Sequence, residues 1–408
     1  MKSNLKQFDE KIRETVLLFD GSMGALLSSM GHASECPELF NVEDPKLIQS
    51  IHQQYMEAGA KVLITNSLGS NPIKLGRVGL SGRSKELTQA AVQNARAVAQ
   101  DQAYVALDVG PTGEFLAPLG TMTLEDMIEA FSIVCQAGRE AGADLILLET
   151  MTDIAEARAA CLAARETGLP ICASFTFEPN GHTLTGGSPE CAALCLQAVG
   201  ARVMGINCSG GPVEMLAPLD AMRRVCALPI VVQPNAGLPQ VDAEGNAHYR
   251  FSAQDMAPLM QDILSHGASA IGGCCGTTPE HIRLMAPLTG GPVPQPKGSG
   301  VGYVCSSRRV RKAEEALAGA VEIEDVDDLY DLEAEDSAAI LSLSGLSPNQ
   351  AVQLINDAQA ATKKPLLLRA TQAEPLRQAL RHYAGVAGVF SGNELLPVLT
   401  EYGAFRIE

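Results

Sequence analysis

Short apolar runs alternate with longer stretches of helical spacing along the first 290 residues of the chain. Apolar runs of this length, bounded by glycine, proline and polar residues, are typical of buried β-strands. The first stretch between two runs places Ile48, Ile51 and Tyr55 on one face of a helix. Eight strands are predicted by this pattern, at residues 16–20, 62–67, 104–109, 145–150, 171–177, 203–208, 229–235 and 270–275.

Eight alternating strands and helices predict an α/β fold, namely a (β/α)8 TIM barrel followed by a small α/β C-terminal domain. Two of the helices have capping residues where their first turns are expected, at Thr123 with Asp126 and at Ser188 with Pro189. A doubly wound open sheet is the alternative. It is less favoured because the number of units matches a barrel, and because no Gly-x-Gly-x-x-Gly run follows the first strand.

The composition changes after residue 290. Residues 291–303 are rich in glycine and proline, which predicts a linker between a barrel at 1–290 and a second domain at 304–408. The second domain alternates apolar runs with helical segments, so we expect a small α/β domain or an incomplete larger one. Residues 322–336 contain nine acidic side chains and are predicted to form a solvated face, with a docking surface as the alternative.

Charge and composition narrow the classes of partner. A formal net charge of −17 disfavours nucleic acid and anionic membranes, because both repel an acidic surface. No apolar run reaches the ~20 residues of a membrane span, and residues 1–7 lack the apolar stretch of a signal peptide. We therefore expect a cytoplasmic protein whose eleven cysteines are reduced. Five of them are expected to be core residues: Cys135, Cys161, Cys191, Cys195 and Cys226.

Polar residues follow nearly every predicted strand. In a parallel barrel the C-terminal ends of the strands form the active site, so these residues are the candidates for chemistry. Loops are polar in general, and this explains Asn66 or Asp108 as well as a functional role does. Cysteine has no such preference for exposed turns. The strand ends carry Asp20, Asn66, Asp108, Glu149, Cys208, Asn235, Cys274 and Cys275.

The three cysteines among these residues predict a metal site. Cys208 ends the sixth strand, and Cys274 and Cys275 end the eighth. Because neighbouring strands are ~4.8 Å apart, these ends lie about 10 Å apart, within reach of cysteines that share a metal with ~2.3 Å bonds. Adjacent residues of a strand point to opposite faces, so the backbone must turn at the cysteine pair, as the flanking glycines allow. Three thiolates with an open fourth position are typical of catalytic zinc.

The predicted barrel also contains an ordered series of motifs. They are Asp20-Gly21-Ser22-Met23-Gly24, Cys36-Pro37-Glu38-Leu39-Phe40-Asn41, Thr65-Asn66-Ser67, Leu148-Glu149-Thr150, Gly205-Ile206-Asn207-Cys208, Gln233-Pro234-Asn235-Ala236-Gly237 and Gly272-Gly273-Cys274-Cys275-Gly276-Thr277. Together they resemble the homocysteine S-methyltransferase family, and most closely the N-terminal homocysteine-binding module of cobalamin-dependent methionine synthase. The resemblance covers residues 10 to about 290, and its core is the pair of cysteine motifs.

The resemblance implies a zinc-dependent methyltransferase that forms methionine. Zn²⁺ would be held by Cys208, Cys274 and Cys275, and the sulfur of L-homocysteine would take the fourth position. Three thiolates and a dication leave a net charge of about −1, which keeps the bound sulfur nucleophilic. No catalytic side chain beyond the zinc site is implied.

The resemblance also implies partners for the rest of the substrate. Asp20 and Glu149 are the candidates for its ammonium, although each could instead cap the following helix. Backbone amides around Gly21 and Ser22 are candidates for its carboxylate, and Asn235 would steady the metal or the substrate. Cys36 matches a family position that we interpret as packing.

The methyl donor is expected from outside this chain. Residues 304–408 are too short for a folate barrel and lack the Asp-x-His-x-x-Gly run that ligates cobalt. We expect methylcobalamin on a separate corrinoid protein, which the second domain would help to dock; a degenerate folate-domain remnant is another account of that domain. A small donor such as S-methylmethionine or betaine is an alternative. So are a different thiol acceptor and a non-catalytic thiol-binding or assembly subunit.

Overall fold

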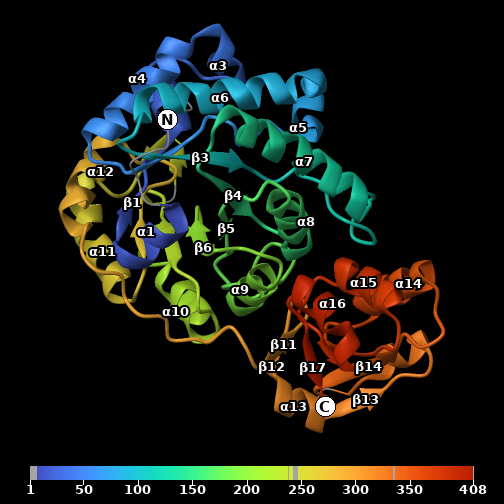
Figure 1. Cartoon of the computed structure of the whole chain (residues 1–408). Coiled ribbons are helices and arrows are strands. Elements are labelled where there is room, and N and C mark those ends of the chain that lie inside the picture. Colours follow the sequence, from blue (N-terminus) through green and yellow to red (C-terminus); the bar gives the residue numbers. More distant parts are fainter. Residues whose placement is uncertain (1–6, 238, 242–246, 334–335, 408) are drawn as a thin grey trace.

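The computed structural model describes residues 7–237, 239–241, 247–333 and 336–407. Eight parallel strands form the wall of a barrel, and helices surround them (Figure 1). The strands pair in the order β1-β10-β7-β6-β5-β4-β3-β2, so strands that are consecutive in the predicted series are neighbours in space. They are β1 (Leu17–Leu18), β2 (Val62–Ile64), β3 (Tyr104–Val109), β4 (Leu145–Met151), β5 (Ile171–Phe175), β6 (Val203–Asn207), β7 (Ile230–Gln233) and β10 (Ala270–Ile271).

The barrel closes between β1 and β2. Phe19 forms a parallel bridge with Val62, and the amide of the next residue, Asp20, donates to the Val62 carbonyl at 3.1 Å. Helix α1 (Phe8–Glu14) covers the opposite end of the barrel from the cysteines, where Phe8 packs edge-on against Phe19. The TIM-barrel prediction is therefore confirmed.

Six of the eight strands are shorter than the sequence pattern predicted. Among them, β1, β2 and β10 end at Leu18, Ile64 and Ile271, before the predicted ends at 20, 67 and 275. The last of these runs leaves the ladder because its backbone turns. The Cys274 amide donates to the Pro234 carbonyl at 2.9 Å, and the Thr277 amide donates back to the Cys274 carbonyl at 3.1 Å.

The inward-facing positions of the strands change from apolar to polar along the barrel axis. Side chains alternate across a strand, so residues two apart share a face. On β3, Ala106 belongs to the packed interior and the next inward position is Asp108. On β4, Leu147 leads in the same way to Glu149. The apolar layers fill the barrel, and the polar layer above them becomes the floor of a cavity.

The helices pack their apolar faces on the outside of the strands. The predicted caps are confirmed, because Thr123 Oγ1 accepts from the Asp126 amide at 3.1 Å and Ser188 Oγ accepts from the Cys191 amide at 3.2 Å. In the described part of the chain, no helix has the length and apolar character needed to cross a bilayer. The helices after α1 are α2 (Met23–Ser29), α3 (Phe40–Glu43), α4 (Pro45–Glu57), α5 (Pro72–Gly76), α6 (Ser84–Ala99), α7 (Leu124–Ala141), α8 (Ile154–Arg165), α9 (Pro189–Ala198), α10 (Leu216–Val225), α11 (Ala253–Ser265) and α12 (Pro279–Met285).

A second, five-stranded parallel sheet follows the barrel, so the small α/β region is present as predicted. Its strands pair in sequence order, β13-β14-β15-β16-β17, which is the order found in a barrel wall and lacks the reversal of a doubly wound sheet. The domain limits at 290 and 303 stay predictions. The elements are β11 (Tyr303–Cys305), β12 (Val310–Lys312), α13 (Ala313–Ala318), β13 (Ala320–Glu322), β14 (Ala338–Ser342), α14 (Pro348–Ala361), β15 (Leu366–Arg369), α15 (Ala373–His382), β16 (Gly388–Phe390), α16 (Leu396–Glu401) and β17 (Phe405–Ile407).

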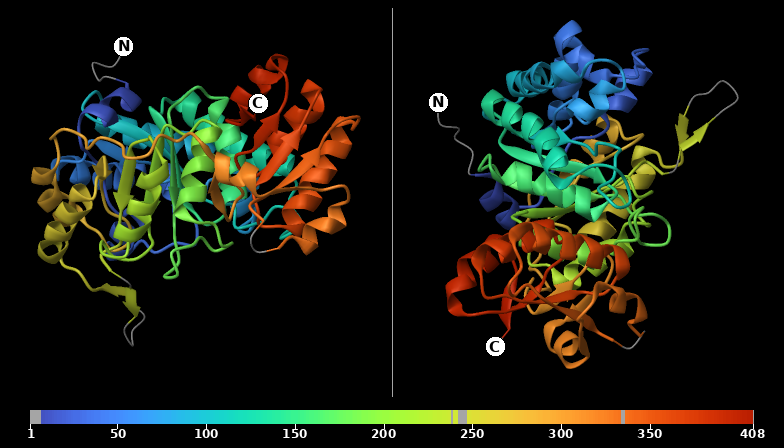
Figure 2. Two further views of the ribbon diagram at one scale, coloured as in Figure 1. Left: turned by 90° about the horizontal axis from the view of Figure 1, so that it is seen from below. Right: turned by 90° about the vertical axis from the view of Figure 1, so that its right-hand side faces the viewer.

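Arg158 of α8 joins the barrel to this second region, which lies beside α8 and α9 (Figures 1 and 2). Its side chain is buried, and its guanidinium donates to the carbonyls of Leu380 (2.6 Å) and Arg381 at the C-terminal end of α15. Burial lowers the pKa of Arg158 to about 10, so the group stays charged at neutral pH. A cation at the end of a helix is favourable because the last carbonyls have no helical partner.

Replacing Arg158 with alanine should lower the free energy of unfolding by about 3 kcal/mol, because two buried carbonyls lose a charged donor. Arg381→Ala is the matched control, since it removes a more exposed ion pair with Glu125 across the same boundary and should cost less than about 1 kcal/mol. Equal losses in denaturant titrations of the two variants would contradict the role given to Arg158.

His52 of α4 should make the fold acid-labile. It is fully buried, and neither ring nitrogen has a partner among the described residues. Burial lowers its pKa from 6.5 to about 4. Between these two pH values the imidazole is therefore protonated in the unfolded chain and neutral in the folded chain. Stability is therefore lost as the pH falls, by about 2 kcal/mol for this group between about pH 7.5 and pH 5. Unfolding free energies measured at both pH values should show that His52→Leu lacks this part of the loss.

Candidate metal centre and substrate pocket

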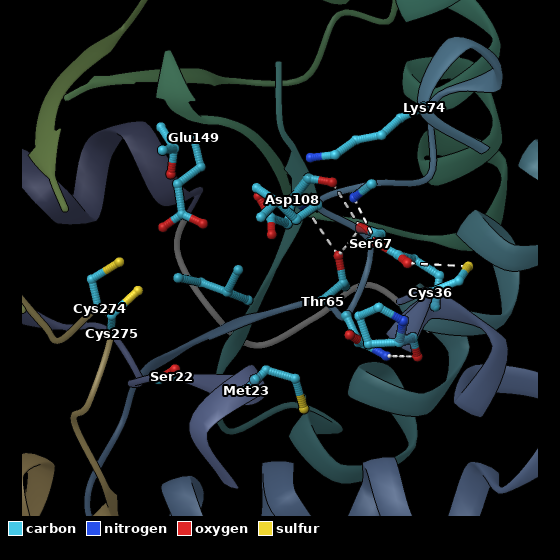
Figure 3. A pocket seen from close by; sticks show the side chains of 18 of the residues that line it. Ser22, Met23, Cys36, Thr65, Ser67, Lys74, Asp108, Glu149, Cys274 and Cys275 are labelled. Atoms are coloured by element: carbon cyan, nitrogen blue, oxygen red, sulfur yellow. Dashed lines mark hydrogen bonds between the residues drawn. The ribbon is translucent and has the colours of Figure 1, made fainter. Parts of the chain in front are cut away.

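A cavity of about 450 Å³ opens at the C-terminal ends of the barrel strands. All three predicted metal ligands line it. Figure 3 shows Cys274 and Cys275 at one end, Asp108 in the middle, Glu149 between it and the cysteines, and the Lys74 side chain reaching toward Asp108 from the other side. The size is that of a pocket for one or two small molecules.

The three cysteine sulfurs converge on one point. The Sγ atoms of Cys208, Cys274 and Cys275 all lie within 4.8 Å of one another, and those of Cys208 and Cys275 are 3.7 Å apart. Two sulfurs bound to one tetrahedral zinc ion at ~2.3 Å would be about 3.8 Å apart. The geometry therefore fits zinc. Among the described residues, no other group of three histidine, cysteine or acidic side chains is close enough to bind a metal.

Strand β7 is the template that brings the two cysteine loops together. The Cys208 amide donates to the Gln233 carbonyl at 3.3 Å, and the amide of Ala236 donates to the Cys275 carbonyl at 2.9 Å. Cys208 itself has a φ of 57°, a left-handed conformation that is costly for any residue except glycine. These hydrogen bonds on either side of the β7 segment hold both cysteine loops in place. They keep Cys208 in its strained conformation, with its Sγ directed at the Sγ atoms of Cys274 and Cys275.

Asn235 bridges the same two loops with its side chain. Its Oδ1 accepts from the Cys275 amide at 3.1 Å, and its Nδ2 donates to the Cys208 carbonyl at 3.3 Å. The described lining of the cavity does not include Asn235. The structure therefore places this residue behind the ligands, in contact with their backbone.

Asn207 was missed by the sequence analysis, although it stands directly before Cys208 in one of the motifs. Its Oδ1 accepts from Ser174 Oγ at 2.7 Å and from the Thr150 amide at 3.1 Å, and its Nδ2 donates to Thr150 Oγ1 at 2.8 Å. The same Nδ2 lies 3.9 Å from Cys274 Sγ. Asn207 thus holds the end of β4 in place against the sulfur site.

Two carboxyl groups meet on the floor of the cavity. Burial raises the pKa of Glu149 to about 7, with the nearby Cys275 thiolate adding to the rise and a hydrogen bond with Asp108 opposing it. Burial and the charge of Glu149 also raise the pKa of Asp108, whose Oδ1 has no partner among the described residues. Two buried carboxyl groups this close share a proton or bind a cation such as an ammonium.

The thiols respond to crowding in a similar way. Hydrogen bonds from Cys208 and Cys274 lower the pKa of Cys275, while hydrogen bonds with Cys208 and Cys275 raise the pKa of Cys274 well above its usual value. Without a metal ion, the three cysteines therefore favour one thiolate, at Cys275, that accepts hydrogen bonds from two thiols. A dication stabilises all three thiolates, which is what metal binding requires.

The other predicted substrate residues lie in different places. Gly21 and Ser22 line the cavity, but Ser22 Oγ caps α2 and the Ser22 amide donates to Thr277 Oγ1 at 3.3 Å. Asp20 is buried outside the described lining, and its Oδ2 accepts from the Ile64 amide at 2.9 Å where the barrel closes. Their roles in binding substrate stay predictions.

A β-hairpin that the sequence analysis missed stands beside the sulfur site. Its strands β8 (Pro239–Val241) and β9 (Ala247–Tyr249) follow β7 and project from the barrel (Figure 2). The Tyr249 ring packs on Gly276, where a Cβ would lie 2.3 Å from the ring. Burial, and then the three cysteines, raise the pKa of Tyr249. The ring therefore covers one side of the site.

Comparison with known proteins agrees with this geometry. The chain matches the profile of the homocysteine S-methyltransferase family over residues 17–288. It is 32% identical to the methionine synthase of Mycobacterium leprae over 308 residues, which is 70% of this chain and 25% of that protein. The methionine synthase of Mycobacterium tuberculosis is also 32% identical, over 67% of this chain and 25% of its own length. The chain thus spans about a quarter of the length of these relatives.

A solved structure is similar over nearly its whole length. The homocysteine methyltransferase MmuM from Escherichia coli, in its oxidized form, has a TM-score of 0.58 and 27% identity, and the match covers 69% of this chain and 97% of that one. Its metallated form has a TM-score of 0.57 and 27% identity, over 67% and 96% of the two chains.

The sulfur site should bind one Zn²⁺ per chain, and Cys208→Ala, Cys274→Ala or Cys275→Ala should each abolish its retention after gel filtration. Cys36→Ala is the matched control, because Cys36 lines the same cavity without joining the sulfur group. Metal content measured by mass spectrometry decides the matter. Full zinc in Cys274→Ala, or its loss in Cys36→Ala, would refute the assignment.

Proposed function

Because the chain belongs to the homocysteine S-methyltransferase family, we propose that it transfers a methyl group to the thiol of L-homocysteine and forms methionine. The observation that carries the proposal is the convergence of three cysteine sulfurs within 4.8 Å at one end of a cavity whose floor holds two carboxyl groups. Homocysteine carries a thiol, which suits the sulfur site, and an ammonium a few bonds away, which suits the two carboxyl groups.

The proposed metal is zinc, held by Cys208, Cys274 and Cys275. When bound, zinc would lower the pKa of the substrate thiol so that it reacts as a thiolate at neutral pH. Asn235 fixes the backbone of two of these ligands, and Tyr249 shields the site from one side. A partly dehydrated sulfur is a better nucleophile than one that is fully hydrated.

Glu149 is the proposed partner of the substrate's ammonium. It lines the cavity between the cysteines and Asp108, and burial, with the Cys275 thiolate adding to the rise, raises its pKa to about 7. An ammonium in this position would replace the shared proton and let both carboxylates ionise. Binding of the amino group would thereby fix the distance from the head group to the thiol.

For the methyl donor we propose methylcobalamin on a separate corrinoid protein, as the resemblance to the cobalamin-dependent methionine synthase module implies. The second sheet region would serve as its docking domain. The match to nearly the whole length of MmuM, a shorter homocysteine methyltransferase, supports a second candidate. In that case a small donor such as S-methylmethionine or betaine would enter the cavity itself.

Methionine formation by zinc-loaded protein tests the proposal. Homocysteine should be methylated from at least one of methylcobalamin, S-methylmethionine and betaine, and Glu149→Gln should raise the KM for homocysteine by about 10- to 100-fold through loss of a charged hydrogen bond. Glu114→Gln is the control, because Glu114 pairs with Arg77 outside the cavity and should leave KM unchanged. Zinc-loaded protein that yields no methionine from any of the three donors would speak for an assembly subunit instead.

A further inference from the structure

Strand β4 has a local irregularity at Glu149. Three steps along β4, from Leu148 to Met151, match only two steps along β5 in the pairing of the two strands. One extra residue is thus inserted at Glu149 and Thr150, which makes this a β-bulge. A bulge interrupts the alternation of a strand and can re-aim a side chain next to an active site. Here the re-aimed side chain is that of Glu149, which lines the cavity beside the cysteines (Figure 3).

The backbone of the bulge is strained. Thr150 has a φ of 59°, a left-handed conformation that is particularly unfavourable for a β-branched residue. Two hydrogen bonds from one side chain hold it there. The Thr150 amide donates to Asn207 Oδ1 at 3.1 Å, and Asn207 Nδ2 donates back to Thr150 Oγ1 at 2.8 Å. The bulge therefore depends on a residue outside its own strand, because strained backbone persists only where its surroundings support it.

Asn207 reaches the bulge from the strand that carries a predicted metal ligand. It is fully buried at the end of β6, directly before Cys208. Its Oδ1 also accepts from the hydroxyl of Ser174, at 2.7 Å, on the intervening strand β5. Its Nδ2 lies 3.9 Å from Cys274 Sγ. One side chain thus spans from β6 across β5 to β4, and it contacts the sulfur group on the way.

This connection fixes the separation of two subsites. The proposed function places the substrate thiol at the three sulfurs and its ammonium at Glu149. Two rigidly spaced subsites favour an amino acid thiol with the matching number of carbons and disfavour a shorter or longer one. Resting on the proposed function, we infer that Asn207 is a positioning residue. By holding the Glu149 bulge at a fixed place relative to the sulfurs, it sets the chain length of the amino acid thiol that the pocket accepts.

Calorimetry on zinc-loaded protein tests the inference with three amino acid thiols of increasing length, namely cysteine, homocysteine and 2-amino-5-sulfanylpentanoic acid. Wild type should bind homocysteine at least about 10-fold more tightly than either neighbour, the effect of one methylene in a fitted pocket. Asn207→Ala should reduce this preference to less than about 3-fold, because the bulge is no longer held. It should still retain one zinc ion per chain, since all three cysteines remain. Zinc is measured before and after each titration to detect its removal by the free thiols.

Two further variants separate positioning from simple packing. Asn207→Asp keeps the acceptor for the Thr150 amide and the Ser174 hydroxyl, so it should keep most of the preference. When Asn207→Ala is combined with Thr150→Gly, part of the preference should return, because glycine adopts a positive φ without strain. Asn94→Ala is the matched control. Asn94 is also buried, and its Nδ2 donates to a backbone carbonyl at 2.9 Å outside the cavity, so its loss should leave the preference unchanged.

The inference and the proposed function fail in different ways. If folded Asn207→Ala keeps the full preference, or loses affinity for all three thiols by the same factor, Asn207 does not set the spacing, while the proposed function stands. If zinc-loaded wild type binds homocysteine no better than cysteine, the proposed acceptor is wrong and the inference falls with it. Should Asn207→Ala not fold, Thr150→Ala decides instead. It lacks the hydroxyl that Asn207 binds, and an unchanged preference in this variant would refute the inference.

Discussion

The gathering of negative charge at the mouth of the barrel is the constraint on which the rest of the site depends. Three sulfurs lie within 4.8 Å of one another, and two buried carboxyl groups meet beside them. Apolar layers below keep water out, so these groups cannot all ionise without cations. The site is therefore complementary to two cations at once, one that thiolates prefer and one that carboxylates prefer.

Neutral amides hold this charge together. Asn235 forms hydrogen bonds with the backbone of both cysteine loops, and Asn207, directly before Cys208, forms them with Thr150 and Ser174. These bonds add no further charge, and each asparagine joins segments from different strands. A lysine or arginine in either place would form ion pairs with the thiolates and compete with a metal. Asparagine supplies a donor nitrogen and an acceptor oxygen in fixed geometry, so it can bridge two backbones and leave the sulfurs free.

The sequence predicted the barrel, the turn at Cys274 and the meeting of the three cysteines, because each follows from strand periodicity and from the fixed order of neighbouring strands. It did not predict Lys74, since a lysine on a short helix looks the same in sequence whether it faces solvent or a cavity. It also failed for Asn207, whose role depends on a local irregularity in β4. The β8–β9 hairpin was missed because residues 238–249 contain few apolar positions to reveal a strand.

The pairing of β10 with β1 has a consequence for how the protein is made. A ribosome releases the N-terminus first, so β1 emerges long before the strand that covers its free edge. Cys208 likewise waits for its two partners, which lie 66 and 67 residues further along the chain and follow β10 directly. The barrel can therefore close, and the three sulfurs can meet, only late in synthesis, when β10 and the residues after it have been made. A metal ion that needs all three sulfurs would therefore bind only after the last strand of the barrel has been made.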